Sequence, residues 1–345
     1  MPDQMQHITL ASRPEGAPTP DNFKLETAPL PSPGDGEILV RVHYMSLDPY
    51  MRGRMDDSKS YAAAVPVGGT MEGGGVGEVI ASNSDRFKPG EVAMGPFGWA
   101  THAVADGRMC RKIDPDAAPI TTSLGVLGMP GFTGWYGLHE IGKPKAGETL
   151  VVAAATGPVG SMVGQLAKSL GLRAVGIAGG ADKCALAVDT FGFDACLDHR
   201  AFPDARALRK ALAEAAPDGI DIYFENVGGK VLEAVIPLMN PHGRIPLCGM
   251  ISWYNAGGLG AGAEAAMSVP ALWRSILVQH LTVRGFIISN HWDRMPDFLA
   301  DVAPKVANGE IKVVEDIAQG LENAPAAFIG LLEGRNVGKQ LVKLV

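Results

Sequence analysis

The chain has 345 residues, 46% hydrophobic and 19% charged, so it can bury more than one hydrophobic core. A formal net charge of −7 without any basic run argues against a nucleic-acid or anionic-membrane surface. No apolar stretch is long enough to span a bilayer, and residues 1–10 do not have the pattern of a secretory signal, so we expect a cytoplasmic protein. The four cysteines are widely spaced and predict neither a disulfide framework nor a structural zinc; they are Cys110, Cys184, Cys196 and Cys248.

The first third of the chain is rich in glycine and proline and has the pattern of short strands. Apolar residues alternate through 37–44, and further strands are predicted at 75–81 and 91–94, with a turn at 87–90. This pattern predicts an all-β, barrel-like beginning. Six glycines suit the tight corners of a small barrel or, alternatively, a flexible loop; they are Gly68, Gly69, Gly73, Gly74, Gly75 and Gly77.

From about residue 129 the pattern changes, and strands alternate with helices, which implies right-handed βαβ units and a parallel sheet. The predicted strands are 150–155, 173–178, 195–198, 220–225, 244–248 and 281–288. The predicted helices are 159–170, 182–190, 202–216, 230–238 and 272–280. Residues 255–262 are rich in Gly and Ala and predict a mobile loop. The tail, 296–345, is expected to hold one or two helices and a closing strand at 340–344.

The most informative segment joins the first of these strands to its helix through the turn Ala155-Thr-Gly157-Pro-Val-Gly160. The usual dinucleotide fingerprint is G-x-G-x-x-G, and here alanine takes the place of the first glycine. A strand, a glycine turn and an amphipathic helix together place a pyrophosphate at a helix N-terminus. The segment therefore predicts a dinucleotide cofactor and redox chemistry. The helix is expected to bury one face, formed by Val159, Met162, Val163, Leu166, Ala167 and Leu170.

The following strand bears on the choice between NAD and NADP. NAD sites place an acidic residue at its end, but here the strand ends in residues 176–180 without one. Lys183 follows at the start of the next helix, where a cation can pair with a 2′-phosphate, and Arg200 and His199 can add to this field. The alternative is that Lys183 is simply a solvated helix residue. We favour NADPH.

Zinc ligands are the feature that would indicate an alcohol dehydrogenase. A catalytic zinc needs about three protein ligands. His43, His102 and Cys110 are scattered without a close cysteine quartet, and each is more typical of a hydrogen-bonded structural residue. The sequence therefore predicts a metal-free mechanism.

Motifs spread along nearly the whole chain resemble those of the medium-chain dehydrogenase/reductase superfamily. The resemblance is greatest to its zinc-free double-bond reductases, which include leukotriene B4 dehydrogenase/prostaglandin reductases, plant alkenal reductases and, most similar of all, bacterial NADPH-dependent curcumin reductases. The matching segments are 46–55, 127–134, 153–160, 178–184, 223–229, 248–255, 286–288 and 334–340.

The resemblance implies a GroES-like β-barrel-type domain, residues 1–130 plus 302–345, and a Rossmann domain with a doubly wound parallel sheet, residues 131–301. It also implies which residues bind NADPH. The pyrophosphate is expected at the glycine turn, the 2′-phosphate at Lys183, and the nicotinamide beside the later loops. The implied cofactor residues are Thr156, Gly157, Pro158, Val159, Gly160, Gly179, Lys183, His199, Asn226, Cys248, Gly249, Met250, Ile251, Ser252, Tyr254, Phe286, Ile287, Ile288 and Asn336.

The implied reaction is hydride transfer from NADPH to the β-carbon of an enone or enal. Negative charge then develops on the carbonyl oxygen, so the site needs a donor aimed at that oxygen. Tyr254 is the first candidate and Tyr50 the second, with the ribose hydroxyl of the cofactor as another; both tyrosines are alternatively apolar walls. Quinone reduction, a non-catalytic NADPH-binding protein and zinc-dependent alcohol oxidation are the rival hypotheses. A homodimer formed through the 281–288 strand is also expected.

Overall fold

The computed structural model describes residues 4–58, 60–256 and 268–345. The chain divides into two compact units. Unit 1 contains Met1–Gly125, Tyr254–Gly262 and Val314–Val345, and unit 2 contains Val126–Trp253 and Ala263–Val313. The domain boundaries predicted above remain a prediction; the second of them, after residue 301, falls inside α8 (Met295–Ala307), which lies entirely in unit 2.

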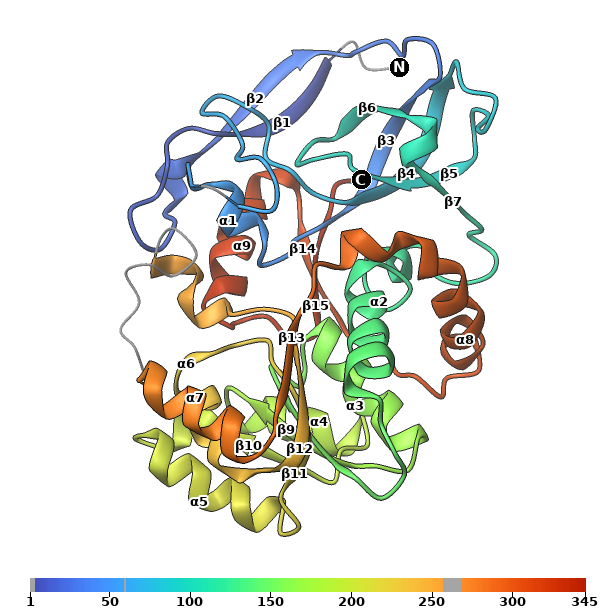
Figure 1. Ribbon diagram of the computed structural model, residues 1–345. Helices are drawn as coiled ribbons and strands as arrows, with labels where there is room; N and C mark the ends of the chain where they lie inside the picture. Colours follow the sequence, from blue (N-terminus) through green and yellow to red (C-terminus); the bar gives the residue numbers. More distant parts are fainter. Residues whose placement is uncertain (1–3, 59, 257–267) are drawn as a thin grey trace. The chain divides into compact units, whose positions relative to one another are not determined.

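Unit 1 is built on a seven-stranded sheet in the order β14-β15-β3-β4-β5-β7, with β6 also paired to β3. Its pairs are antiparallel apart from β14 with β15, and β1 and β2 form a separate antiparallel pair (Figure 1). The strands are β1 (Gln4–Leu10), β2 (Phe23–Pro29), β3 (Glu37–Ser46), β4 (Gly75–Ser82), β5 (Val92–Gly95), β6 (His102–Asp106), β7 (Arg111–Ile113), β14 (Glu315–Gln319) and β15 (Lys339–Lys343). The unit also contains α1 (Met51–Arg54) and α9 (Ala324–Leu332).

An aromatic cluster and close-packed glycines hold unit 1 together. The buried Trp99 ring stacks on Phe23 at 5.5 Å and meets the edge of Phe328 on α9 at 5.5 Å, so the returning tail shares the core of the N-terminal strands. Gly68 lies in a turn at φ 84°, whereas Gly77 lies within β4, where a Cβ atom would approach Arg41 O to 2.0 Å. Gly68 therefore permits a turn and Gly77 permits close packing of two strands, and neither indicates a flexible loop.

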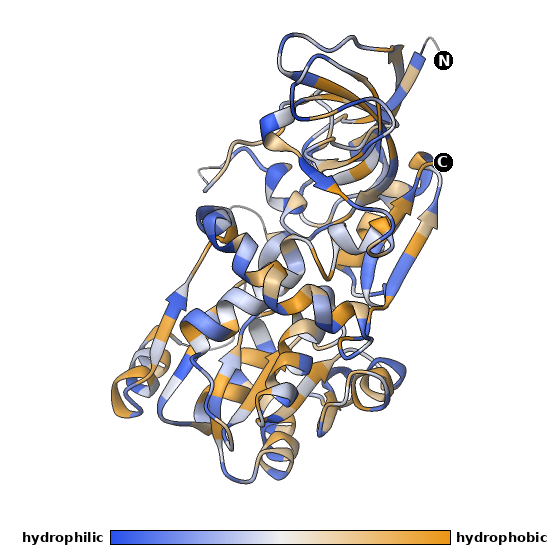
Figure 2. Cartoon of the chain, turned by 90° about the vertical axis from the view of Figure 1, so that its right-hand side faces the viewer, coloured by the Kyte–Doolittle hydropathy of each residue, from blue (hydrophilic) through white to orange (hydrophobic). Residues whose placement is uncertain are grey.

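Unit 2 contains the predicted parallel sheet, with six strands in the order β10-β9-β8-β11-β12-β13. The strands are β8 (Thr149–Ala153), β9 (Arg173–Ala178), β10 (Ala195–Asp198), β11 (Ile220–Phe224), β12 (Met239–Leu247) and β13 (Thr282–Gly285). If the six strands are numbered by their order in the sequence, their order across the sheet is 3-2-1-4-5-6, which is the doubly wound arrangement. The direction of this order reverses between β8 and β11. Figure 2 shows hydrophobic residues gathered on these central strands.

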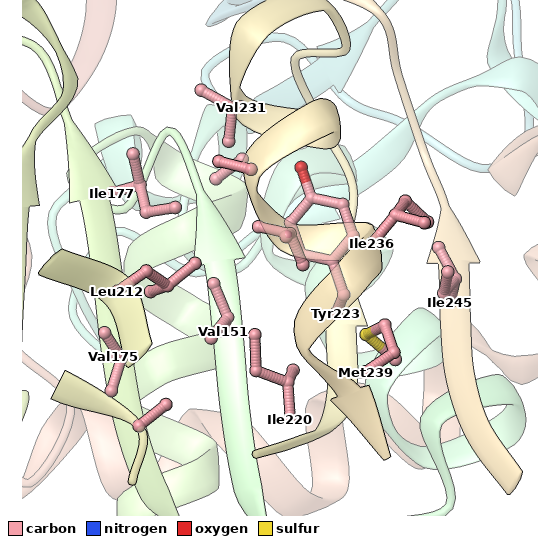
Figure 3. Packing of buried hydrophobic residues seen from close by; sticks show 14 of the residues in the cluster. Val151, Val175, Ile177, Leu212, Ile220, Tyr223, Val231, Ile236, Met239 and Ile245 are labelled. Atoms are coloured by element: carbon pink, nitrogen blue, oxygen red, sulfur yellow. The ribbon is translucent and has the colours of Figure 1, made fainter. Parts of the chain in front are cut away.

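Helices cover both faces of this sheet (Figure 1). They are α2 (Met129–Tyr136), α3 (Pro158–Ser169), α4 (Ala181–Asp189), α5 (Ala205–Ala215), α6 (Gly229–Val235) and α7 (Val269–Val278), with α8 following β13. One face is packed by α5 and α6, whose apolar side chains join those of the strands in a single buried cluster, and partly buried side chains of α7 pack against this cluster. Figure 3 shows this cluster, in which the buried Tyr223 ring lies among Val151, Ile220, Ile236 and Met239.

Several element boundaries differ from the sequence predictions for physical reasons. Helix α5 begins at Ala205 rather than at residue 202, because the Asp204 side chain caps it by accepting a hydrogen bond from the Ala207 N–H at 2.8 Å. Leu170, expected on the buried face of α3, follows the last helical residue and is 37% exposed. The parallel strand β14 in the tail was not predicted. Of the predicted loop 255–262, Asn255 and Ala256 end a 3₁₀ helix, and the remainder lies outside the described residues.

Among the described residues, β13 is an edge strand of the parallel sheet, and all four of its residues are exposed. Helix α7 has no buried residue and exposes Trp273 and Leu277 at 64% and 75%. None of the helices among the described residues is long and apolar enough to cross a membrane.

Candidate functional site

The residues predicted to bind a cofactor in unit 2 lie at the carboxyl ends of its parallel strands. At the reversal point of the strand order, Asn226 follows β11, and its Nδ2 donates to the Ala153 carbonyl at the end of β8 at 2.9 Å. The glycine turn starts directly after Ala153. Ligands of doubly wound sheets bind at this point, outside the carboxyl ends of the strands.

The glycine turn brings the start of α3 very close to the end of β8. Gly157 is the N-cap of α3 and Pro158 its first residue, where the missing N–H costs nothing. A Cβ atom at Gly160 would approach Ala154 O to 2.2 Å, so only glycine fits there. Ala154, one residue before the alanine that replaces the first fingerprint glycine, has a left-handed φ of 53°. The first N–H groups of α3 have no acceptor within the helix, so they are available to an anion.

A basic group surrounds Gly179 at the end of β9. A Cβ atom on Gly179 would lie 2.8 Å from Arg200 Nε and 3.1 Å from His199 Nε2. Asp198 holds this arrangement, since its Oδ1 accepts from the N–H groups of Gly180 at 2.8 Å and Arg200 at 2.9 Å. Burial lowers the pKa of His199, and the cations Lys230, Arg200 and Lys183 lower it further. The field beside Gly179 is therefore positive, as a phosphate requires.

A buried acid not anticipated from the sequence joins two of the predicted cofactor loops. Glu225 is 1% exposed, and its Oε1 accepts from the N–H groups of Val227 at 2.6 Å and Gly228 at 2.9 Å. Its main-chain oxygen accepts from Cys248 at 3.0 Å and Gly249 at 3.2 Å in the neighbouring loop. Glu225 therefore braces the loop that carries Asn226 against the loop that begins at Cys248.

Two further contacts connect the same loops. The N–H groups of Ile251 and Ser252 donate to the carbonyls of Asn226 and Val227 at 3.1 and 3.0 Å. A Cβ atom on Gly228, which has φ 80°, would lie 3.0 Å from the Trp253 ring. The predicted segments after β11 and β12 are thus joined to each other by hydrogen bonds and close packing within unit 2.

The pKa values of Glu225 and of two acidic groups near it, Cys248 and Tyr223, are raised. Burial raises the pKa of Glu225 itself, against the lowering effect of the Val227 and Gly228 N–H groups. Burial and the nearby Glu225 raise the pKa of Cys248 to about 12, and they also raise that of Tyr223. The Cys248 thiol is therefore protonated near neutral pH and is not a nucleophile.

The remaining predicted cofactor residues of unit 2 follow β13. Phe286 and Ile288 are each 9% exposed, and the Phe286 N–H donates to Leu247 O at 3.4 Å. The Phe286 ring packs against Tyr136 of α2 at 5.7 Å. This segment therefore lies next to the end of β12, from which the Cys248 loop departs.

Both candidate tyrosines belong to unit 1. Tyr50 is half-buried, directly before α1, and follows Asp48, which is held by the buried Lys339 through an ion pair of 2.8 Å. Lys339 Nζ also donates to Leu47 O at 2.7 Å. Burial raises the pKa of Tyr50, and Asp48 raises it further, so its hydroxyl keeps its proton and can act as a hydrogen-bond donor.

The segments that carry the two tyrosines meet at one loop. Arg52, fully buried in α1, donates to the Gly16 carbonyl at 2.7 Å and pairs with Asp56 at 2.6 Å. A Cβ atom on Gly16 would lie 3.9 Å from the carbonyl of Asn255, the residue after Tyr254. Arg52 is therefore a structural ion-pair partner, and the Gly16 loop to which it donates lies against the residue that follows Tyr254.

Asn336, one of the predicted cofactor residues, lies in the tail of unit 1. Its Nδ2 donates to Gly338 O at 2.8 Å. It lines a cavity of about 360 Å³ together with Arg335, Asp316 and Gln340. Asn336 and the two tyrosines thus come from unit 1, and every other predicted site residue comes from unit 2.

Comparisons with known proteins show the family to which this chain belongs. Residues 6–113 match a family model described as the N-terminal domain of oxidoreductase, and residues 158–303 match one described as zinc-binding dehydrogenase. The chain is also 48% identical to the NADPH-dependent curcumin reductase of Escherichia coli (strain K12), over 97% of this chain and 95% of the relative. The chain belongs to the medium-chain dehydrogenase/reductase family, which confirms the family predicted from the motifs.

Two further relatives extend the comparison. The chain is 40% identical to the NADP(+)-dependent 2-alkenal reductase of Nicotiana tabacum, over 90% of this chain and 88% of the relative. The crystal structure of CurA from Vibrio vulnificus in complex with NADPH superposes with a TM-score of 0.92, at 50% identity over 99% of both chains.

The description of the second family model mentions zinc. Within residues 4–58, 60–256 and 268–345, no group of three or more His, Cys, Asp or Glu side chains is placed to hold a metal ion. The donor set of the described residues does not fit a zinc site.

Proposed function

We propose that this chain is an NADPH-dependent reductase of the C=C bond of α,β-unsaturated aldehydes and ketones. The observation that carries the proposal is the identity of 48% to a curcumin reductase across nearly the whole chain, together with the clustering of the predicted cofactor residues at one edge of the parallel sheet. The 2-alkenal reductase and the NADPH complex of CurA support the same cofactor and the same class of substrate.

The residues of unit 2 fit NADPH. The first turn of α3, with Gly157 and Gly160, offers N–H groups to the pyrophosphate. Lys183 and Arg200, with His199 beside them, supply positive charge and a polar ring for the 2′-phosphate, and β9 ends without the acid that an NAD ribose requires. We assign the nicotinamide end to Asn226 and the loops that Glu225 braces, because these loops follow β11 and β12 and are joined by hydrogen bonds.

The chain's own residues must then stabilise charge and move a proton. When bound, NADPH supplies the hydride for the β-carbon of the enone. The Tyr254 hydroxyl donates a hydrogen bond to the carbonyl oxygen as negative charge develops there, with Tyr50 as the second candidate and the ribose hydroxyl of the cofactor as the third. A water or a hydroxyl then protonates the α-carbon. We propose that no metal takes part.

We further propose that the protein is a homodimer formed through unit 2. An exposed edge strand normally invites pairing, and β13 follows α7, an exposed helix with apolar residues, after a short connection. A second copy related by a two-fold axis would pair β13 with its own equivalent and cover Trp273 and Leu277 together.

The test is NADPH oxidation by purified, chelator-treated protein against matched panels of enones, simple ketones and quinones, with identification of the products. We expect saturated ketones or aldehydes from the enones, and much lower kcat/KM with the other two panels. Quinone turnover exceeding enone turnover, or allylic alcohol as the product, would replace the proposed reaction with one of its rivals.

A further inference from the structure

Two cysteines of unit 2 that are separated in sequence lie side by side. Cys184 is on α4 and Cys196 is on β10, and the Cys196 thiol donates a hydrogen bond to the Cys184 sulfur at a distance of 3.2 Å. Both residues are half-buried, and both are free thiols. A disulfide bond is about 2.05 Å long, so the two sulfurs need to approach by only about 1.2 Å.

We propose that Cys184 and Cys196 form a reversible redox site, at which a hydroperoxide converts the two thiols into a disulfide. No sequence motif marks this pair, because twelve positions separate the two residues and only the packing of α4 on β10 brings them together.

The reaction balances without any further partner. The Cys184 sulfur, which is the hydrogen-bond acceptor of the pair, attacks the terminal peroxide oxygen; the O–O bond breaks, and a sulfenic acid forms while the alcohol, or water if the oxidant is hydrogen peroxide, leaves. The Cys196 sulfur then attacks the Cys184 sulfur, the S–O bond breaks, and one water leaves with the thiol proton. The two thiols lose two protons and two electrons in total, and the hydroperoxide is reduced.

The surroundings make the pair stable until an oxidant is present in excess. Burial raises the pKa of Cys184 and that of Cys196, so little thiolate exists near neutral pH and we expect the oxidation to be slow. The hydrogen bond from Cys196 acts in the opposite direction on Cys184, which makes Cys184 the thiol that reacts first.

The pair lies beside the basic group around Gly179. Cys184 follows Lys183 directly, and the strand of Cys196 ends at Asp198, which braces the Gly180 and Arg200 N–H groups. A disulfide would therefore tie the start of α4 to β10 and shift Lys183 relative to His199. If the proposed function holds, oxidation should raise the KM for NADPH by about fivefold, the lower end of typical coupling between two sites, and leave kcat nearly unchanged.

Peptide mapping tests the site without any activity assay. Both cysteines fall in one tryptic peptide, Cys184–Arg200, which has no internal Lys or Arg. After treatment of the full-length protein with hydrogen peroxide and alkylation under denaturing conditions, we expect this peptide to escape alkylation and to be lighter by two hydrogen atoms. Dithiothreitol should restore two alkylation sites. The Cys196→Ser variant should lose the intramolecular bond, whereas the matched Cys110→Ser variant should keep it.

Two results would overturn the proposal. One is a Cys184–Arg200 peptide that stays doubly alkylated while Cys110 or Cys248 is oxidised; the other is a pair that proceeds to sulfinic acid without a crosslink. A disulfide that forms without changing the KM for NADPH would overturn the coupling to the phosphate subsite. Failure of the proposed function would instead appear in the reduced protein, as an absence of NADPH turnover, and would leave the peptide result intact.

Discussion

At the scale of single residues, the first question is whether a tyrosine of unit 1 donates the hydrogen bond to the oxyanion. If the Tyr254 hydroxyl donates to the developing oxyanion, Tyr254→Phe should lower kcat for enone reduction by about tenfold or more, within the usual scope of acid–base catalysis. Tyr50→Phe should have a smaller effect. The exposed Tyr61→Phe, 55% accessible, is the matched control and should leave kcat unchanged. Steady-state kinetics with one enone checks this, and unchanged rates in both Tyr254→Phe and Tyr50→Phe would contradict a tyrosine donor.

Substitution of Lys183 tests whether the chain prefers NADPH over NADH. Because an ammonium group pairs with the 2′-phosphate and has no partner of that kind in NADH, Lys183→Ala should raise the KM for NADPH and leave that for NADH nearly unchanged. The exposed Lys210→Ala on α5 controls for loss of one positive charge. Parallel titrations with the two coenzymes provide the measurement. Equal effects on both KM values would remove Lys183 from the phosphate subsite.

The titration of Glu225 makes the free energy of unfolding depend on pH. Its pKa is raised by burial from an ordinary value of 4.5, so above that pH the unfolded chain releases a proton that the folded chain retains. The free energy of unfolding therefore falls as the pH rises from 4.5 through the folded pKa, and the stability contributed by the protonated form is complete only below 4.5.

Glu225→Gln should abolish this pH dependence, so the variant should gain stability relative to the parent protein as the pH rises. Thermal unfolding across the acidic to neutral range measures the difference in Tm. Glu214→Gln, at an exposed position on α5, serves as the control. A Tm difference between the Glu225→Gln variant and the parent protein that stays constant with pH would show that the buried carboxyl does not titrate as described.

The sequence predicts the position of some residues of the candidate site in the fold and not that of others. Gly157 and Asn226 follow the ends of β8 and β11 as expected, because their motifs come directly after apolar strand runs, and their cofactor contacts stay predictions. The bracing role of Glu225 was missed because it depends on a loop in which Gly228 adopts φ 80°. The Cys184–Cys196 contact was missed because only tertiary packing produces it.

At the scale of elements, the turn between β8 and α3 is the most constrained. A Cβ atom on Gly160 would meet backbone, not a flexible side chain, so Gly160→Ala should destabilise the protein by about 1–3 kcal/mol and weaken NADPH binding. Gly142→Ala is a matched control, because its Cβ atom would find only ordinary contacts, at 3.5 Å or more. Denaturant unfolding and NADPH titration measure both effects. Equal stability of the two variants would contradict the close approach.

The elements of unit 2 were largely predictable because buried parallel strands are apolar runs. The predicted bounds of β9 and β10 agree with the structure. The sequence does not predict strand β14, because Glu315–Gln319 has a polar, acidic composition. This segment is a strand because it pairs with β15. Leu170 was misplaced because the helical period was continued past the last helical residue of α3.

For the whole molecule, the proposed dimer predicts a defined effect of surface charge. Leu277 is 75% exposed on α7, and Leu277→Lys should place a charge in the interface and shift the protein toward the monomer. Leu25→Lys, at a position 43% exposed in unit 1, is the matched control and should keep the dimer. Sedimentation velocity distinguishes the two states. A parent protein that is monomeric, or a dimer unaffected by Leu277→Lys, would contradict this interface.

The order of motifs along the chain made the family and the two-unit plan predictable. The most direct test of the central claim uses NADPH with deuterium in place of both C4 hydrogens and an α,β-unsaturated ketone. The account predicts a saturated ketone that carries one deuterium on its β-carbon. Deuterium on the former carbonyl carbon, in an alcohol that keeps its double bond, would contradict it.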